Sequence, residues 1–213
     1  MRRVRAKKSS TPKAAMRQAL KRIRLFATDV DGVLTDGGMY YGESGDELKK
    51  FNTRDGMGIK LLQRAGLITA LITQEETKLV ARRGEKLAIP EIHQRVFDKL
   101  SRLREIAARH EIALEGVAYM GDDVNDLETL QAVGFSATPA DGVASVQNKV
   151  TYVCRVKGGE GAVREVADMI LAAQAGSSEE LWFRTRSHKA SAEVPGSRVE
   201  ARSTRDNNKT FLE

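Results

Sequence analysis

The sequence predicts an α/β fold, a doubly wound, Rossmann-like parallel sheet with helices on both faces and a β-hairpin flap after the first strand. Short apolar runs of strand length recur along the chain, and segments with helical periodicity separate them. Continuously apolar strands are typical of parallel sheets whose two faces are both covered. The chain has 213 residues, of which 41% are hydrophobic, enough to bury one such core.

A short helix is expected before the sheet, because Thr11 is a suitable N-cap and Pro12 is favoured in a first helical turn. Five apolar runs then predict strands at 23–30, 67–73, 117–120, 134–137 and 150–154. The segments with helical periodicity lie at 56–65, 76–87, 97–109, 124–132, 141–147 and 160–174.

Residues 34–51 interrupt the alternation of strands and helices. Two β-prone pieces, 39–42 and 47–51, are separated by Glu-Ser-Gly-Asp, a pattern that predicts a hairpin. Because this hairpin directly follows the first strand, we expect it to project over the carboxyl ends of the strands, where doubly wound sheets bind ligands. The alternative is an edge hairpin without a functional role.

The positive charge of the chain is concentrated at its N-terminus. Of 35 Lys and Arg residues, ten lie in residues 1–24, which carry none of the 29 Asp and Glu residues. Residues 177–213 carry seven basic and six acidic groups, which leaves 18 basic and 23 acidic groups, a net charge of −5, for residues 25–176. The basic start lacks interleaved aromatic residues, so a solvated arm is favoured over a nucleic-acid interface.

We expect three segments: a basic N-terminal extension (1–22), one α/β domain (23–176) and a flexible C-terminal tail (177–213). The extension lacks the apolar run of a signal peptide, although its acid-free start also fits an organelle transit peptide. No apolar run approaches the roughly 18 residues of a membrane span. The single cysteine, Cys154, cannot form an internal disulfide, which favours the cytoplasm.

Two carboxylates end the first predicted strand. Asp29 and Asp31 follow a hydrophobic run and precede Gly32. Residues two apart on a strand point to the same side, and like charges held together there are costly unless a cation neutralises them. Oxygen ligands select a hard cation such as Mg²⁺. The alternative is a solvated turn at the end of a strand.

A second acidic cluster follows the predicted strand at 117–120. Asp122, Asp123 and Asp126 lie directly after it, where aspartates also serve commonly as helix caps. Because the carboxyl ends of parallel strands meet at one edge of a sheet, we expect both acidic clusters to form a single cation site.

Phosphoryl transfer is one reaction that uses such a cation site. Besides the cation, it needs positive charge and hydrogen-bond donors for the phosphate oxygens. Thr73 ends the strand at 67–73, and Lys99 lies near the start of the helix at 97–109. Both are candidates for holding a phosphoryl group, although a strand-end Thr and a helix-start Lys are more often turn and surface residues.

The order of these four features resembles the haloacid dehalogenase superfamily of phosphatases. That superfamily has an Asp-x-Asp on the first strand, a Thr or Ser after the second, a Lys, and then an acidic cluster. The corresponding residues here are Asp29-Val30-Asp31, Thr73, Lys99 and Gly121-Asp122-Asp123-Val124-Asn125-Asp126.

Three longer motifs resemble the capless subgroup that dephosphorylates 3-deoxy-D-manno-octulosonate 8-phosphate in lipopolysaccharide biosynthesis. They lie at 29–37 (DVDGVLTDG), 51–59 (FNTRDGMGI) and 158–165 (GGEGAVRE). The resemblance covers about residues 23–174 and implies a hairpin flap. It also implies a homotetramer in which a neighbouring hairpin helps to close each site.

The resemblance implies a role for each motif residue. Asp29 is the nucleophile and Asp31 the general acid and base, while Thr73 and Lys99 hold the phosphoryl group. Mg²⁺ is held by Asp29, the main-chain carbonyl of Asp31 and Asp122, with support from Asp123 and Asp126. The implied substrate contacts are Asp31, Asn52, Thr53, Arg54, Asp55, Gly56, Arg83, Lys99 and Asn125.

Two positions depart from the subgroup. Glu75 and Glu160 stand where its members usually have arginines. An arginine there suits an anionic sugar acid, so a nonulosonate (sialic-acid-type) 9-phosphate or another sugar phosphate is an alternative substrate. A non-catalytic regulatory module is a further alternative, but it predicts loss of Asp29 or Asp31, and both are present.

Overall fold

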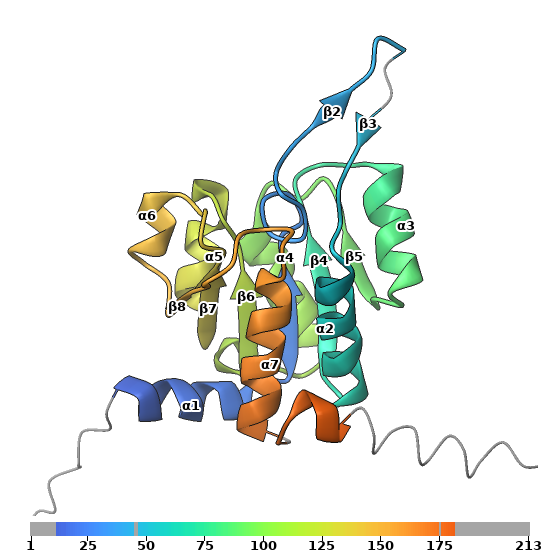
Figure 1. The fold of residues 1–213 in the computed structure, drawn as a ribbon. Coiled ribbons are helices and arrows are strands. Elements are labelled where there is room, and N and C mark those ends of the chain that lie inside the picture. The colour runs from blue at the N-terminus through green and yellow to red at the C-terminus, as the bar shows by residue number, and fades with distance from the viewer. Residues whose placement is uncertain (1–11, 45–46, 175, 182–213) are drawn as a thin grey trace, which may run out of the picture.

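The structure, a computed structural model, describes residues 12–44, 47–174 and 176–181. Its main sheet consists of β1 Leu25–Thr28, β4 Ile68–Ile72, β5 Glu91–His93, β6 Val117–Met120, β7 Phe135–Thr138 and β8 Tyr152–Val153. The strand order is β5-β4-β1-β6-β7-β8 and every pairing is parallel (Figure 1). The predicted doubly wound α/β fold is therefore confirmed.

Helices cover both faces of this sheet (Figure 1). They are α1 Pro12–Arg22, α2 Thr53–Arg64, α3 Lys78–Lys86, α4 Lys99–Arg109, α5 Leu127–Ala132, α6 Ala144–Gln147 and α7 Ala162–Gln174, with short 3-10 turns η1 Leu114–Gly116 and η2 Val124–Asp126. All five predicted strands are present: β1, β4 and β8 are shorter than predicted, β6 has the predicted bounds, and β7 is shifted by one residue. Each predicted helix has a counterpart. The predicted helix at 124–132 begins as the turn η2 and continues as α5.

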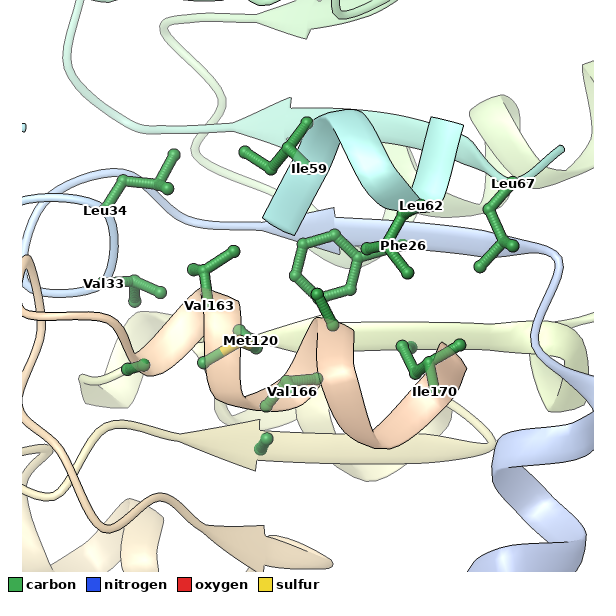
Figure 2. Close-up of a cluster of buried hydrophobic side chains, with 14 of the residues drawn as sticks. Phe26, Val33, Leu34, Ile59, Leu62, Leu67, Met120, Val163, Val166 and Ile170 are labelled. Carbon is green, nitrogen blue, oxygen red and sulfur yellow. The ribbon is translucent and has the colours of Figure 1, made fainter. Parts of the chain in front are cut away.

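The two faces of β1 enter two separate cores. Phe26 packs with α2 and α7 on one face (Figure 2), whereas Leu25 and Ala27 pack with α4 on the other. This follows from the alternation of side chains along a strand. All three side chains are fully buried, and burying a Leu or Phe side chain stabilises a fold by roughly 1.5–3 kcal/mol. The end of β1 is thus fixed by packing on both sides.

Helix α1 packs against the end of α7. Leu20 is buried there, and the Gln174 Nε2 group donates to the Leu20 and Ile23 carbonyls at 2.8 Å each. Residues 12–22 of the predicted basic extension are therefore helical and docked, while residues 1–11 and 182–213 lie outside the described part of the chain. Within the described ranges, no helix combines the length and the apolar character needed to cross a membrane.

A separate antiparallel pair lies where the hairpin is expected. Its strands are β2 Tyr40–Tyr41 and β3 Glu47–Leu48, and a bridge between Thr35 and Phe51 closes its base. Figure 1 shows the pair projecting beyond the main sheet, on the side opposite to α1. Since the pair follows β1, it stands over the carboxyl ends of the parallel strands.

Candidate active site

Asp29 lies at the carboxyl end of β1, in the middle of the sheet. Its backbone N–H still pairs with the Met120 carbonyl of β6 at 2.9 Å, and its Oδ1 accepts the Val30 N–H at 2.7 Å. The chain then turns sharply, with the N–H groups of Leu34 and Thr35 donating to the Val30 carbonyl. Asp29 is therefore held from both sides, and its side chain is almost fully buried.

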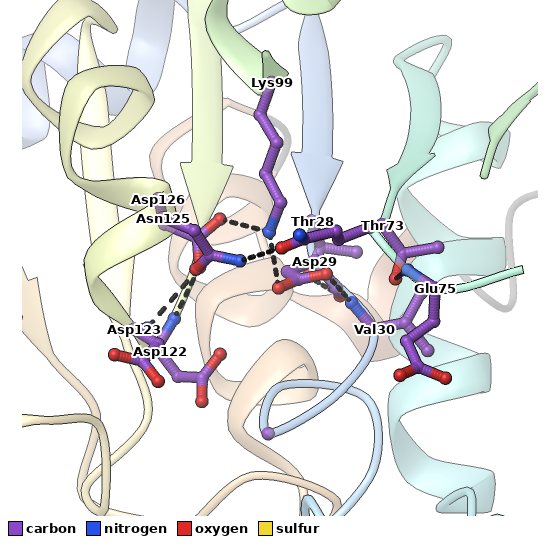
Figure 3. Close-up of polar contacts among 12 residues, drawn as sticks. Thr28, Asp29, Val30, Thr73, Glu75, Lys99, Asp122, Asp123, Asn125 and Asp126 are labelled. Carbon is purple, nitrogen blue, oxygen red and sulfur yellow. Dashed lines mark hydrogen bonds and ion pairs between the residues drawn. The ribbon is translucent and has the colours of Figure 1, made fainter. Parts of the chain in front are cut away.

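Lys99, the first residue of α4, places its ammonium between two carboxylates. Its Nζ lies 2.6 Å from Asp29 Oδ2 and 2.7 Å from Asp126 Oδ1 (Figure 3). Asp126 Oδ1 also accepts from the Tyr119 hydroxyl at 2.7 Å, and all of these groups are buried. Buried charges need such partners, because an isolated one costs several kcal/mol of desolvation.

The Asp122 carboxylate lies directly against Gly32, in the turn after β1. A Cβ added to Gly32 would lie 2.0 Å from Asp122 Oδ2, and Gly32 has a φ of +78°. Both the space and the left-handed backbone therefore require glycine at this position. Burial, followed by repulsion from Asp29 and Asp126, raises the pKa of Asp122 to about 8.

This cluster fits a hard cation. Asp29, Asp122 and Asp126 each offer an oxygen within 4.8 Å of the others. Burial, followed by the charge of Asp126, raises the pKa of Asp29 to about 7 despite the neighbouring Lys99. Carboxylates that repel one another in this way are stabilised by a divalent ion with a preference for oxygen ligands.

The oxygens of Asp126 are already occupied. Oδ1 accepts from Lys99 and Tyr119, and Oδ2 accepts from the backbone N–H groups of Asp122 and Asp123 at 3.1 and 3.4 Å. Each oxygen of Asp126 thus accepts two bonds, which suits the supporting role expected of it. Among the described residues, each oxygen of Asp29 accepts only one, from Val30 and from Lys99. Asp29 and Asp122 are therefore better placed as direct ligands.

A cavity of about 590 Å³ opens over the cluster. Thr73 forms part of its wall and is fixed by a backbone bond from its N–H to the His93 carbonyl at 2.9 Å. The cavity is lined by Asp29, Asp31, Gly32, Gly37, Thr73, Gln74, Glu75, Phe97, Asp122, Asp123 and Asn125. The site thus combines anionic oxygens suited to nucleophilic attack and proton transfer with a lysine and a cation position suited to an anionic group.

The chain matches known proteins over most of its length. A family model described as haloacid dehalogenase-like hydrolase matches residues 63–166. A curated 3-deoxy-D-manno-octulosonate 8-phosphate phosphatase KdsC from Yersinia pestis is 45% identical over 157 residues, which cover 74% of this chain and 84% of that protein. The chain belongs to the haloacid dehalogenase-like hydrolases. The Escherichia coli K12 KdsC is 43% identical over 71% of this chain and 81% of its own.

Solved structures of this hydrolase family share the fold. The Y. pestis phosphatase superposes with a TM-score of 0.75 at 43% identity, covering 76% of this chain and 88% of that one. The Moraxella catarrhalis phosphatase, solved with a magnesium ion, a phosphate ion and KDO, gives 0.76 at 37% identity, covering 80% of this chain and 97% of that one. The resemblance inferred from the motifs is therefore confirmed.

In this haloacid dehalogenase-like hydrolase, the structure brings together the catalytic and metal-site residues predicted from the sequence. Asp29, Asp31, Thr73, Asp122 and Asp123 line the cavity, and Lys99 and Asp126 contact this group directly. Asn125 also lines the cavity, and its Nδ2 donates to Gln74 Oε1 at 3.3 Å.

The other predicted substrate contacts lie outside the cavity lining of this chain. Asn52 caps α2 and donates to the Gly159 carbonyl at 3.1 Å, and Arg83 donates to the Asn52 carbonyl at 2.8 Å. Asp55 is buried and accepts from the Arg164 N–H at 2.9 Å. Substrate contact therefore stays a prediction for Asn52, Thr53, Arg54, Asp55, Gly56 and Arg83.

Sequence reasoning missed several groups at the site. Gln74 and Phe97 line the cavity, Tyr119 binds Asp126, and Lys49 of the hairpin reaches Asp31. Gln74 directly follows the strand-end Thr73, and this position at the carboxyl end of a strand could have indicated that it lies at the site. Tyr119 lies inside a fully apolar run, and Lys49 lies in a polar hairpin, so neither stands out in the sequence.

Proposed function

We propose that this chain is a Mg²⁺-dependent phosphatase that hydrolyses 3-deoxy-D-manno-octulosonate 8-phosphate to 3-deoxy-D-manno-octulosonate and phosphate. Its 45% identity to a curated phosphatase for that substrate carries the proposal. The meeting of a buried aspartate, a lysine and a second acidic cluster in one cavity supports the same reaction class.

Asp29 is the proposed nucleophile. Its carboxylate oxygen attacks phosphorus, the new oxygen–phosphorus bond forms an aspartyl-phosphate, and the bond to the sugar oxygen breaks. The fixed backbone around Asp29 restricts its side chain to one orientation, which is the positioning that phosphoryl transfer chiefly requires.

Asp31 is the proposed acid and base. It gives its proton to the leaving sugar oxygen, and it then takes a proton from the water that attacks the aspartyl-phosphate. This second attack releases phosphate and restores both carboxyl groups. Asp31 lines the same cavity as Asp29, and acid and base catalysis at the reacting phosphate requires this placement.

The remaining groups hold the phosphoryl oxygens. An ammonium has three donors, and Lys99 uses two of them on Asp29 and Asp126, so the third is available for a phosphoryl oxygen. Thr73 offers a hydroxyl beside the same cavity. Asp29, the Asp31 carbonyl and Asp122 would hold Mg²⁺, which when bound neutralises phosphate charge and lets the anionic nucleophile approach.

The proposed substrate is tested by assaying the purified protein for phosphate release against a panel of sugar phosphates in the presence of Mg²⁺. We expect the octulosonate 8-phosphate to give the highest kcat/KM. Phosphates of hexoses, which lack the sugar-acid carboxylate, should be at least about tenfold lower, since a pocket that binds a substrate's polar groups penalises their loss. A neutral hexose phosphate with the highest kcat/KM would contradict the proposed substrate.

A nonulosonate 9-phosphate is the second candidate, and Glu75 is the observation that favours it. Glu75 lines the cavity at a position where the motif resemblance implies an arginine, so this wall carries a negative charge in place of a positive one, a difference of two charges. We expect Glu75→Gln to change the ratio of kcat/KM between the two sugar acids by about 3-fold or more, since it removes a charge from one wall. Glu76→Gln, one position farther along, is the matched control. Equal kcat/KM ratios in the wild type and both variants would show that Glu75 does not contribute to the choice between the two substrates.

We also propose that the enzyme is a cytoplasmic homotetramer. The projecting hairpin carries three exposed large hydrophobic residues, Tyr40, Tyr41 and Leu48, which are 55%, 72% and 63% exposed. A two-stranded hairpin is marginally stable alone, and apolar side chains on it are better covered by a second copy. Light scattering of the purified protein is expected to give four times the chain mass, and a monomeric mass would contradict the proposal.

A further inference from the structure

Lys49 brings a charge from the hairpin to the proposed acid and base. It follows β3 directly, and its Nζ lies 2.6 Å from Asp31 Oδ1 and 3.7 Å from Glu75 Oε2. The Lys49 side chain has no exposed surface, and its Nζ also lies 3.7 Å from the sulfur of Met39. Three segments thus meet at one ammonium: the turn after β1, the hairpin that follows it and the more distant turn after β4.

The neighbouring residue shows that this arrangement is specific to Lys49. Lys50 Nζ pairs with Asp36 at 3.1 Å, and 57% of its side chain is exposed. Successive residues of an extended chain point to opposite sides, so the hairpin directs one lysine inward and the next one outward. The buried charge of Lys49 depends on carboxylate partners such as Asp31 and Glu75, because an unpartnered buried charge is strongly unfavourable.

The two oxygens of Asp31 have different surroundings. Oδ1 is held by Lys49, whereas Oδ2 is buried without a hydrogen-bond partner among the described residues. A buried unpartnered oxygen is costly to maintain and is typical of a functional site. With one oxygen fixed, the carboxyl plane is fixed as well, and the second oxygen is left for the substrate.

We propose that Lys49 is a positioning residue that holds Asp31 in the orientation needed for proton transfer to and from the reacting oxygens. The proposal deepens the proposed function, on which it rests for the role of Asp31. Proton transfer requires the donor within hydrogen-bond reach, and a misplacement of about 1 Å costs about 100-fold in rate. A carboxyl released from Lys49 rotates freely and spends little time in the reactive orientation.

The test compares a substrate that needs the acid with one that does not. Lys49→Met removes the charge with little change in volume, and Lys50→Met is the matched control. With the sugar phosphate, whose leaving oxygen must be protonated, we expect kcat of K49M to fall by about 10–100-fold with KM within about 3-fold, which is part of the roughly 100–10,000-fold that a positioned acid contributes. K50M is expected to stay near wild type.

With p-nitrophenyl phosphate, whose leaving group departs without protonation, the first-turnover release of nitrophenolate by K49M is expected to stay within about 3-fold of wild type. Lys49→Arg, which keeps the charge, is expected to recover at least about a third of the lost kcat. If K49M shows no cooperative melting transition, Lys49→Gln replaces it with the same expected difference between the substrates.

Three results would overturn the proposal: equal loss on both substrates, a raised KM with unchanged kcat, or an unchanged K49M. Failure of the proposed function has a different signature, because the wild type itself then does not turn over the octulosonate phosphate. The Lys49 comparison is in that case made on any alkyl phosphate that the wild type accepts, since it requires only a poor leaving group.

Discussion

Asp29→Asn is expected to lower kcat for any phosphate monoester by more than about 1,000-fold, as removal of a covalent nucleophile does in other enzymes. The amide has nearly the same shape as the carboxyl, so it keeps the bond from the Val30 N–H to the side-chain oxygen. It lacks the anionic oxygen that attacks phosphorus. The loss should therefore appear in kcat rather than in the folded state, with a cooperative melting transition retained.

The control is Asp168→Asn on α7, which removes a carboxylate that pairs with Arg164 away from the cavity. It is expected to change kcat by less than about 2-fold, because surface ion pairs contribute little. Acid quenching of the wild type during turnover should trap phosphate on the peptide that contains Asp29. Residual activity near wild type in D29N, or phosphate trapped on another residue, would refute the assignment of the nucleophile.

The fold could be read from the sequence wherever burial is complete. Strands β1, β4, β6 and β7 are buried along nearly their whole length and appear as apolar runs. Strand β5 was missed because it is a half-buried edge strand of sequence Glu-Ile-His. Its Glu91 pairs with His93, Arg109 and His110, so polar contacts replace the apolar pattern there.

The candidate site could be predicted to the extent that topology determines it. Residues at the carboxyl ends of neighbouring parallel strands must meet, and Asp29 and Asp122 do. The contact of Lys49 with Asp31 depends on how the hairpin bends back over the sheet, which no local pattern encodes. Arg83 is a similar case, since its bond to the Asn52 carbonyl joins residues 31 positions apart.

Lys99 illustrates how the structure refines a sequence-based role. The sequence suggested a phosphate clamp, and the structure adds that Lys99 already balances Asp29 and Asp126. Three buried or partly buried carboxylates nevertheless face this single lysine within the described cluster. Burial, followed by their mutual repulsion, raises the pKa of both Asp29 and Asp122, so the protein without metal favours protons at positions that a cation would otherwise stabilise.

Removal of metal is therefore expected to affect both activity and stability. Treatment with EDTA should lower kcat by more than about 100-fold, since the cation contributes several kcal/mol of charge stabilisation to phosphoryl transfer. Adding Mg²⁺ in excess should restore it. Turnover that is indifferent to chelation would remove the proposed metal site.

The stability of the EDTA-treated protein is expected to fall as pH rises from about 4 to about 8. In the unfolded chain, the aspartates lose their protons near their ordinary pKa of 3.8, whereas folded Asp29 and Asp122 keep theirs until about 7 and about 8. The folded state thus holds more protons over this interval, and its advantage declines as they are removed. Melting temperatures measured across this pH range should decline in EDTA, more weakly in Asp122→Asn, and least with Mg²⁺ present. A melting temperature that stays constant or rises with pH in EDTA would show that the charges of the cluster do not destabilise the fold. The physical reason for a cation at this site would then be removed.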